Sequence, residues 1–338
     1  MNNKIVRVAV IGAGGIARGV HLPSLSEIPF VRMDAICDLK RERAQALADG
    51  YDIPRVYTLY EEMLEQVKPD AVFVLVRPDE LYRVVLNALR AGCHVFAEKP
   101  AGITLYQAQS LLRISHETGR QLQIGFNRRF IPLVQHVLDK MRTLGPINQI
   151  DGWFYKHGDA AFYQGCSSAF TCDAIHTLDL IRYAARSNGE CGSMLTATYN
   201  DSPVPNAWNG WIRFENGLTG TFHSNYATGG RVHGLALHGP RASAYINLGF
   251  GGEACKATLL YNVEGTFSLS AGGGGKQHIE EIDGLTVAGD DRYFRYYGYY
   301  AQDLAFVQAV RDGMPVSCGI EDALHTMELL EMLETSAK

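Results

Sequence analysis

The sequence lacks the long apolar run that a membrane-spanning helix requires. Of its 338 residues, 46% are hydrophobic and 20% are charged, but no run reaches the roughly 18 apolar residues needed to cross a bilayer. The amino-terminal apolar run ends in glycines after only about seven residues, which does not fit a cleaved secretion signal. We therefore expect a cytoplasmic protein of ordinary globular composition with no membrane partner.

The sequence also lacks patterned cysteine and an excess of basic charge. Its seven cysteines include no C-x-x-C pair, which fits neither a disulfide framework nor a zinc site, so we expect reduced thiols. Its 31 lysines and arginines against 36 acidic residues give a formal charge of -5. Because a polyanion is held by a basic surface, nucleic acid is not an expected partner.

The chain is longer than the roughly 250–300 residues at which a single core stops growing, so we expect two domains. The first 126 residues alternate β-branched apolar runs with helix-forming segments. We expect strands at residues 5–11, 31–38, 55–58, 71–76, 94–100 and 121–126, with helices at 16–26, 40–50, 81–92 and 104–119. Gly50, Gly92 and Gly119 would end three of these helices, and Thr104 with Gln107 would form a capping box at the start of the last one. The alternation predicts an α/β Rossmann domain over residues 1–126, with ligands at the carboxyl ends of its strands.

Residues 127–338 have a different pattern. Most of residues 147–285 read as strands separated by turns, and Asn216-Gly217 predicts a tight hairpin. Helices are expected after Pro132 and at residues 173–183, 299–312 and 320–335, whereas the glycines at 272–275 predict a loop. We expect an α+β domain with a mainly antiparallel sheet that binds substrate and makes oligomer contacts.

A glycine-rich turn directly follows the first strand. The stretch Gly12-Ala13-Gly14-Gly15-Ile16-Ala17 fits the pattern G-x-G-x-x-G/A. Gly12 permits the tight turn, Gly14 lets the backbone approach a pyrophosphate, and Ala17 lets helix and strand pack closely. This position between strand and helix predicts dinucleotide binding.

Asp38 ends the second strand about twenty residues beyond these glycines. A carboxylate there accepts hydrogen bonds from the adenosine ribose and repels a 2′-phosphate, so it favours NAD. Lys40 and Arg41 leave NADP open, because they would compensate that phosphate if the loop turned them inward; otherwise they are solvated charges.

Glu98-Lys99-Pro100 follows the expected strand that begins at residue 94. A lysine delivered there lies at the edge of the sheet where Rossmann ligands bind. The sequence therefore predicts a functional Lys99.

These motifs, together with ALRAGCHVFAEKP and the later AIHTLDLIRY, resemble the glucose-fructose oxidoreductase and inositol dehydrogenase family, called Gfo/Idh/MocA. The resemblance implies a Rossmann domain followed by a large open sheet, a crossover at residues 127–129, and a dimer or tetramer. It implies that Lys99 and His176 are catalytic and that Pro78 and Glu98 lie near the nicotinamide.

Two positions depart from the family pattern. Tyr82 stands where the family often has histidine, and Cys172 stands where its catalytic aspartate usually lies. We expect the adjacent Asp173 to orient His176 instead and Cys172 to pack at the pocket wall; the alternative is that Asp173 caps a helix. Asp179 lies on the same expected helix, but we expect no metal there.

These features predict an NAD-dependent oxidoreductase acting on the hydroxyl or keto group of a sugar, an inositol or a sugar derivative. His176 would take the hydroxyl proton and Lys99 would polarise the oxygen. Two alternatives stay open. One is a redox-assisted glycoside lyase or hydrolase that retains NAD, and the other is an NAD-binding sensor without catalysis.

Overall fold

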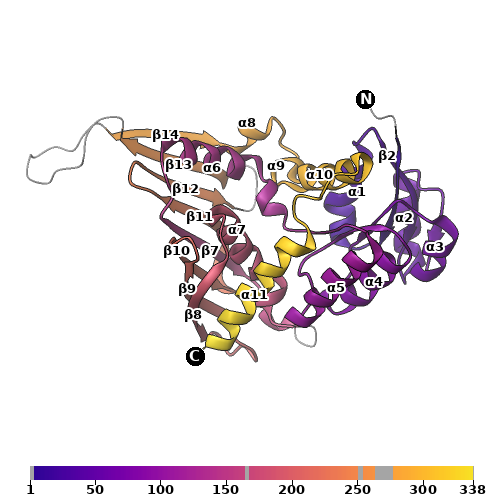
Figure 1. The fold of residues 1–338 in the computed structure, drawn as a ribbon, viewed down its shortest axis with the longest axis horizontal. Coiled ribbons are helices and arrows are strands. Elements are labelled where there is room, and N and C mark those ends of the chain that lie inside the picture. The colour runs from indigo at the N-terminus through magenta and orange to yellow at the C-terminus, as the bar shows by residue number, and fades with distance from the viewer. Residues whose placement is uncertain (1–3, 164–166, 250–253, 263–276, 338) are drawn as a thin grey trace, which may run out of the picture.

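The computed structural model describes residues 4–163, 167–249, 254–262 and 277–337. Two sheets lie side by side, with the amino-terminal sheet at the right of Figure 1 and the second sheet at the left. The expected fold class, a Rossmann domain followed by an α+β domain, is confirmed. The predicted glycine loop at 272–275 lies outside the described residues.

The first sheet has six parallel strands in the order β3-β2-β1-β4-β5-β6. Since every strand runs in one direction, all their carboxyl ends lie at one edge. The strands are β1 (Val6–Ile11), β2 (Val31–Cys37), β3 (Val56–Tyr57), β4 (Ala71–Val74), β5 (His94–Ala97) and β6 (Leu122–Ile124).

Helices connect these strands as the sequence predicts, with two differences. They are a π-helical turn (Ala17–His21), α1 (Leu22–Ser26), α2 (Arg41–Gly50), α3 (Tyr60–Val67), α4 (Pro78–Arg90) and α5 (Leu105–Thr118). The short α3 was not predicted. Gly50 is the last residue of α2 rather than its cap, and Tyr51 takes the cap position.

The second sheet has eight strands in the order β14-β13-β12-β11-β7-β10-β9-β8. Its neighbouring strands are antiparallel except β10 and β7, which are parallel, so the mainly antiparallel prediction is confirmed. The strands are β7 (Gln149–His157), β8 (Gly189–Ala197), β9 (Ala207–Phe214), β10 (Thr219–Asn225), β11 (Ala227–His238), β12 (Ala242–Leu248), β13 (Cys255–Asn262) and β14 (Gln277–Asp283).

Helices cover one face of this sheet and reach back to the first domain. They are a short 3-10 turn (Asn127–Phe130), α6 (Pro132–Leu144), a second 3-10 turn (Ala160–Tyr163), a π-helical turn (Phe170–Ala174), α7 (Ile175–Ala185), α8 (Gly284–Ala288), α9 (Tyr293–Tyr296), α10 (Tyr299–Asp312) and α11 (Ile320–Ser336). Figure 1 shows α11 between α7 and α5.

The carboxyl-terminal helices join the two domains. Phe306, Val307 and Val310 of α10 are buried in the same apolar cluster as β1, and α11 packs against α5, α7 and β8. The chain therefore crosses to the second sheet after β6 and returns to the Rossmann domain near its carboxyl terminus. A division of the chain at residue 126 stays a prediction.

Local signals set several element ends. The Thr104 side chain accepts a hydrogen bond from the Gln107 amide, and Gly119 ends α5 with a φ of 63°. Asn216 and Gly217 lie between the paired strands β9 and β10, with Gly217 at a φ of 84°. These are the expected cap, helix end and hairpin.

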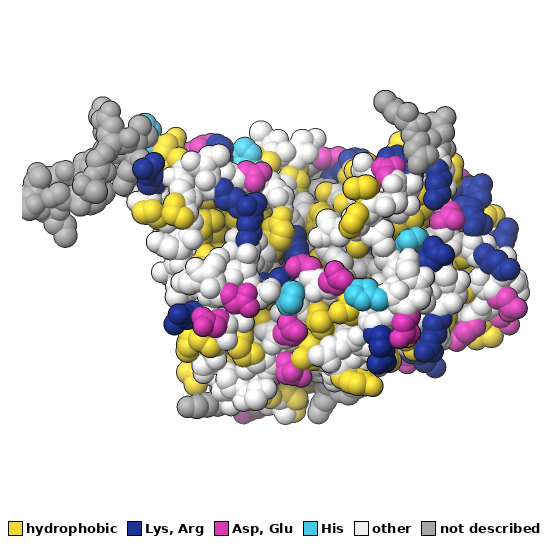
Figure 2. All heavy atoms as spheres, in the orientation of Figure 1, with side chains coloured by type: hydrophobic (Ala, Val, Ile, Leu, Met, Phe, Trp, Pro, Cys, Tyr) yellow, Lys and Arg dark blue, Asp and Glu magenta, His cyan; other side chains and the backbone are white. Residues whose placement is uncertain are grey.

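The surface carries charges of both signs. On the face in Figure 2, acidic and basic side chains are interspersed, and acidic ones gather along the middle, where α11 lies. In the described residues, no helix is both long and apolar enough to cross a membrane. Six of the seven cysteines are described, and each is a free thiol.

Candidate active site

The predicted cofactor and lysine positions gather at the carboxyl edge of the Rossmann sheet. Gly12 follows β1, Asp38 follows β2, Pro78 begins α4 after β4, and Glu98 and Lys99 follow β5. Because β1, β2, β4 and β5 are neighbouring parallel strands, these five residues lie along one edge of the sheet, the edge at which an open α/β sheet binds its ligands.

The glycine-rich turn has the geometry of a dinucleotide cradle. Gly12 has a φ of 103°, and a Cβ there would lie 2.4 Å from the Leu75 carbonyl oxygen, so only glycine fits. A Cβ at Gly14 or Gly15 would meet no atom within 4 Å, which leaves open space over both residues. Ile16 and Ala17 continue into the following helical turn, and buried Ala17 leaves room for close packing.

The Asp38 carboxylate lies against this turn. Its Oδ2 accepts a hydrogen bond from the Ala13 amide at 2.8 Å, and its Oδ1 accepts one from the Lys40 amide at 2.8 Å. The side chains of Lys40 and Arg41 are exposed. The residues present therefore fit a bound dinucleotide, with the carboxylate beside the expected ribose position.

Lys99 connects this edge to the second domain. Its Nζ donates a hydrogen bond to the Cys172 carbonyl oxygen at 2.8 Å and lies 3.6 Å from Asp173 Oδ1. Cys172 and Asp173 belong to the π-helical turn that precedes α7. The structure therefore brings together Lys99, Asp173 and the beginning of α7, which were predicted from separate motifs.

Asp173 accepts hydrogen bonds from two further residues that the sequence did not indicate. Lys156 Nζ and the Tyr226 hydroxyl, at 2.6 Å, both donate to Oδ2. Burial alone would raise the pKa of Asp173, but the ammonium groups of Lys99 and Lys156 outweigh it and hold that pKa well below its usual range. Asp173 is thus an ionised carboxylate between two lysines.

Asp173 is not a helix cap. The π-helical turn begins after Ala169 and α7 after Ala174, and neither start has a capping side chain. The helix-cap alternative is therefore wrong, because Asp173 lies inside the helical segment with its carboxylate turned to the lysines.

His176 lies in the first turn of α7 and is 7% exposed. Its Nδ1 has no hydrogen-bond partner among the described residues, so Asp173 does not accept from that atom here. Burial lowers the pKa of His176 well below 6.5, and the charges of Lys99 and Arg128 lower it further. The imidazole is therefore neutral and has a free ring nitrogen.

Glu98 takes part in a buried network that sequence reasoning missed. The fully buried His21 places Nε2 3.1 Å from Glu98 Oε1 and Nδ1 3.0 Å from Asp303 Oδ2. Burial lowers the pKa of His21, but the two carboxylates reverse this effect and raise it to about 10. A charged imidazole therefore fixes Glu98 beside Lys99.

Other residues weighed from the sequence lie outside this cluster. Asp179 pairs with Arg129, and the Tyr82 hydroxyl is 2.9 Å from the Ser110 hydroxyl. Asn127 donates to the Tyr297 carbonyl oxygen and so anchors the crossover. Within the described ranges, no group of three His, Cys, Asp or Glu side chains is arranged to hold a metal ion.

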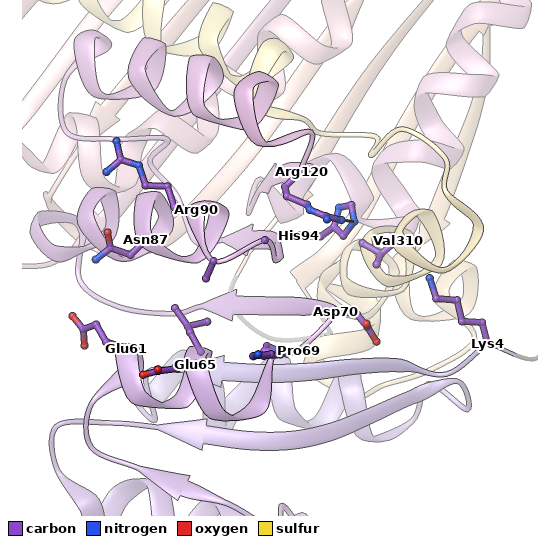
Figure 3. Close-up of a pocket in the computed structure, with 14 residues that line it drawn as sticks. Lys4, Glu61, Glu65, Pro69, Asp70, Asn87, Arg90, His94, Arg120 and Val310 are labelled. Carbon is purple, nitrogen blue, oxygen red and sulfur yellow. Dashed lines mark hydrogen bonds between the residues drawn. The ribbon is translucent and has the colours of Figure 1, made fainter.

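A cavity of about 830 Å³ lies at the opposite edge of the Rossmann sheet. Figure 3 shows Asp70 and His94 at this cavity, at the beginnings of β4 and β5, with Lys4 nearby and Glu61 and Arg90 farther along. None of the predicted site residues lines it. Its charges are mixed, and it is separate from the predicted site residues at the carboxyl edge.

Residues 6–126 match the family model described as the oxidoreductase family with an NAD-binding Rossmann fold, Gfo/Idh/MocA. These residues therefore form an NAD-binding Rossmann domain of the Gfo/Idh/MocA oxidoreductase family. Two curated relatives are similar to this chain over part of their length. D-glucoside 3-dehydrogenase of Escherichia coli is 35% identical over 150 residues, or 44% of this chain and 42% of the relative. Inositol 2-dehydrogenase of Salmonella typhimurium is 30% identical over 184 residues, or 53% and 54% of the two chains.

The matched segments thus span about half the length of these relatives or less. The likeness to solved structures extends over the whole fold. GenD2 from gentamicin A biosynthesis, solved in complex with NAD, has a TM-score of 0.81 and 22% identity, with 98% of this chain and 94% of that chain covered. At this identity the likeness establishes the fold of both domains.

Proposed function

We propose that this protein is an NAD-dependent oxidoreductase that transfers a hydride between the nicotinamide and a secondary hydroxyl or keto group of a sugar, an inositol or a sugar derivative. The observation that carries the proposal is the contact of Lys99 with Cys172 and Asp173. It places the carboxyl edge of the Rossmann sheet against the helical segment that holds His176. Relatives named for D-glucoside and inositol oxidation support the substrate class.

The proposed chemistry needs a hydride acceptor, a base and a polarising group. When bound, NAD supplies the hydride acceptor. Lys99 donates a hydrogen bond to the substrate oxygen, and neutral His176 takes the hydroxyl proton through its free ring nitrogen. A secondary alcohol and NAD then give a ketone, NADH and one proton, and the reverse reaction uses the same groups.

Asp173 acts on this machinery through charge. It holds the ammonium groups of Lys99 and Lys156 and favours the positive charge that His176 gains on protonation. The carboxylate that is absent at position 172 is thus supplied by the next residue. This favours an enzyme over a non-catalytic sensor.

NAD is the proposed cofactor in preference to NADP. The Asp38 carboxylate lies within hydrogen-bond distance of the glycine-rich turn, where it repels a 2′-phosphate, and Lys40 and Arg41 extend into solvent. Pro78 and Glu98 are proposed to lie near the nicotinamide at the same edge of the sheet.

The outer face of the second sheet is the proposed oligomer contact. Leu195, Trp211, Tyr245 and Ile279 are large apolar side chains exposed on β8, β9, β12 and β14. An exposed patch of this kind favours self-association into a homodimer or homotetramer. Light scattering on the purified chain tests this, and a monomer at all concentrations would contradict it.

The catalytic proposal is tested by following NADH absorbance while the protein is mixed with NAD and a panel of sugars, inositols and glycosides. We expect NADH to form in proportion to ketone. A redox-assisted lyase would instead cleave a glycoside with no net NADH, and mass spectrometry of the products detects that outcome. Tight NAD binding with neither product across the panel would contradict the enzyme and favour a sensor.

A further inference from the structure

Arg128 and Arg129 are neighbours in the crossover between the two domains, and both are buried, at 3% and 4% exposure. Arg129 pairs with the carboxylates of Asp179 and Asp322. Within the described part of the chain, Arg128 has no carboxylate partner; its polar contact is His233, and its guanidinium lies 4.8 Å from the centre of the Phe154 ring. Because a buried cation without a counter-ion is costly to desolvate, Arg128 points to a ligand that brings negative charge.

His233 extends this donor surface. It is fully buried on β11 and stacks on Phe154 with ring centres 3.9 Å apart. Arg128 Nη2 lies 2.8 Å from His233 Nδ1, and since a guanidinium only donates, Nδ1 must accept. The neutral ring then carries its proton on Nε2, which is buried without a partner among the described residues. The pair therefore presents hydrogen-bond donors.

This donor pair lies next to the proposed reaction centre. Phe154 stacks on Tyr226 with ring centres 6.1 Å apart, and Tyr226 donates to Asp173. The charge of Arg128 also reaches His176, where it adds to burial and to Lys99 in lowering the pKa of that imidazole. The pair and the proposed catalytic residues thus lie close together.

The charge balance around this site is positive. Lys156 and Arg231 line an adjoining pocket of about 390 Å³ together with Tyr163 and Asp159. Counting Lys99 and Arg128, four cations lie around this site with three described carboxylates, Asp173, Asp159 and Glu98. A substrate with one negative charge offsets this excess.

We propose that Arg128 and His233 form a subsite for a carboxylate of the substrate, so that the preferred substrate is a sugar acid, an aldonate or a uronate. The inference rests on the proposed oxidoreductase function and narrows its substrate class. Arg128 gives the carboxylate a charge-assisted contact, and His233 Nε2 gives it a second donor.

The test compares matched sugars with the NAD-loaded protein. The probes are D-glucose, D-galactose and D-mannose, each with its uronate, aldonate and 6-phosphate, and the readout is kcat/KM from NADH formation. We expect kcat/KM for the best acid to exceed that of its neutral parent by at least about tenfold, as for a site with an otherwise unpaired charged donor. A binding readout is the shift in Tm that each probe causes in the NADH-bound protein.

Variants locate the subsite. Arg128→Gln should raise KM for the acid at least about tenfold and affect the neutral sugar much less, because the lost contact is a buried charge pair. Arg128→Lys keeps the charge and should restore part of the preference, which covers a Gln variant that folds poorly. Arg213→Gln and His223→Gln are controls on the same sheet, where Arg213 pairs with Glu190 and His223 contacts Asn209 away from this cluster.

The outcomes separate the two proposals. Equal or better use of neutral sugars, a preference for the phosphates, or an acid preference that survives Arg128→Gln would overturn the carboxylate subsite while the oxidoreductase stands. If the acids cause no Tm shift and the protein oxidises neither these sugars nor the inositols and glycosides of the wider panel, both proposals fail.

Discussion

Lys99 donates a hydrogen bond from Nζ to the backbone carbonyl oxygen of Cys172, 2.8 Å away. The lysine follows β5 of the Rossmann sheet, and Cys172 lies in the π-helical turn before α7. This contact joins the two domains at the proposed reaction centre. It also leaves Asp173, rather than Cys172, as the acidic neighbour of the lysine, at 3.6 Å.

The role of Asp173 is tested by removing its charge while keeping the shape of its side chain. Asp173→Asn leaves Lys99 and Lys156 without their shared counter-ion, so Lys99 is held less firmly and His176 gains its proton less readily. We expect turnover to fall at least about tenfold, in the range of a lost charged contact at the transition state. Steady-state NADH formation and a thermal melt measure the two effects.

Cys172→Ser is the matched control, because Lys99 contacts the backbone of Cys172 and that contact survives the change. We expect turnover within a few-fold of the unmodified protein. A lower Tm with unchanged turnover in Asp173→Asn would show that the carboxylate serves stability alone.

Cofactor choice depends on the contact between Asp38 and the glycine-rich turn. We expect a higher kcat/KM with NAD than with NADP. Asp38→Ser should reduce the ratio of these two values at least about tenfold, because the change removes an acceptor for the ribose hydroxyls and a charge that repels the 2′-phosphate. Kinetics with both cofactors measure the ratio. A preference for NADP in the unmodified protein would mean that Lys40 and Arg41 decide the choice.

The buried His21 predicts a specific pH dependence of stability. Burial opposes its charge, yet Asp303 and Glu98 raise its pKa from 6.5 to about 10. Because the folded state holds this proton more tightly than the unfolded state, the stabilisation is complete below about pH 6.5 and is lost as pH rises toward 10. We expect Tm to fall over this interval more steeply than in His21→Gln.

Thermal melts of both proteins between pH 6 and about pH 10 measure this difference. His223→Gln leaves the His21 network intact, since His223 contacts Asn209 instead. It should therefore follow the unmodified protein and show that loss of a histidine elsewhere does not change the slope. Parallel curves for the unmodified protein and His21→Gln would contradict the charged His21.

Turns, helix caps and strands that depend on residues close together in the sequence were predictable. Gly12, the Thr104 cap and the Asn216-Gly217 turn each act within a few residues, and the parallel strands are continuous apolar runs. The short α3 was missed because it ends at Lys68, which takes a φ of 50° without the glycine that usually marks such an end.

Contacts between distant segments were not predictable. His21 and Asp303 are 282 residues apart in sequence, and no local pattern couples them. Lys156 and Tyr226 reach Asp173 through the parallel pairing of β7 with β10, which depends on strand register across the sheet. The residues around Lys99 and His176 therefore required the folded chain.

The central claim is that Lys99 and His176 act on the substrate while the glycine-rich turn holds the cofactor. Its most direct test measures turnover and NAD affinity for Lys99→Ala and His176→Ala, with the best substrate of the panel and with NAD titrated by protein fluorescence. We expect each variant to lose at least about a hundredfold in turnover, the scale of a lost acid-base group, while its NAD affinity stays within a few-fold. Near-normal turnover in both variants would contradict the account.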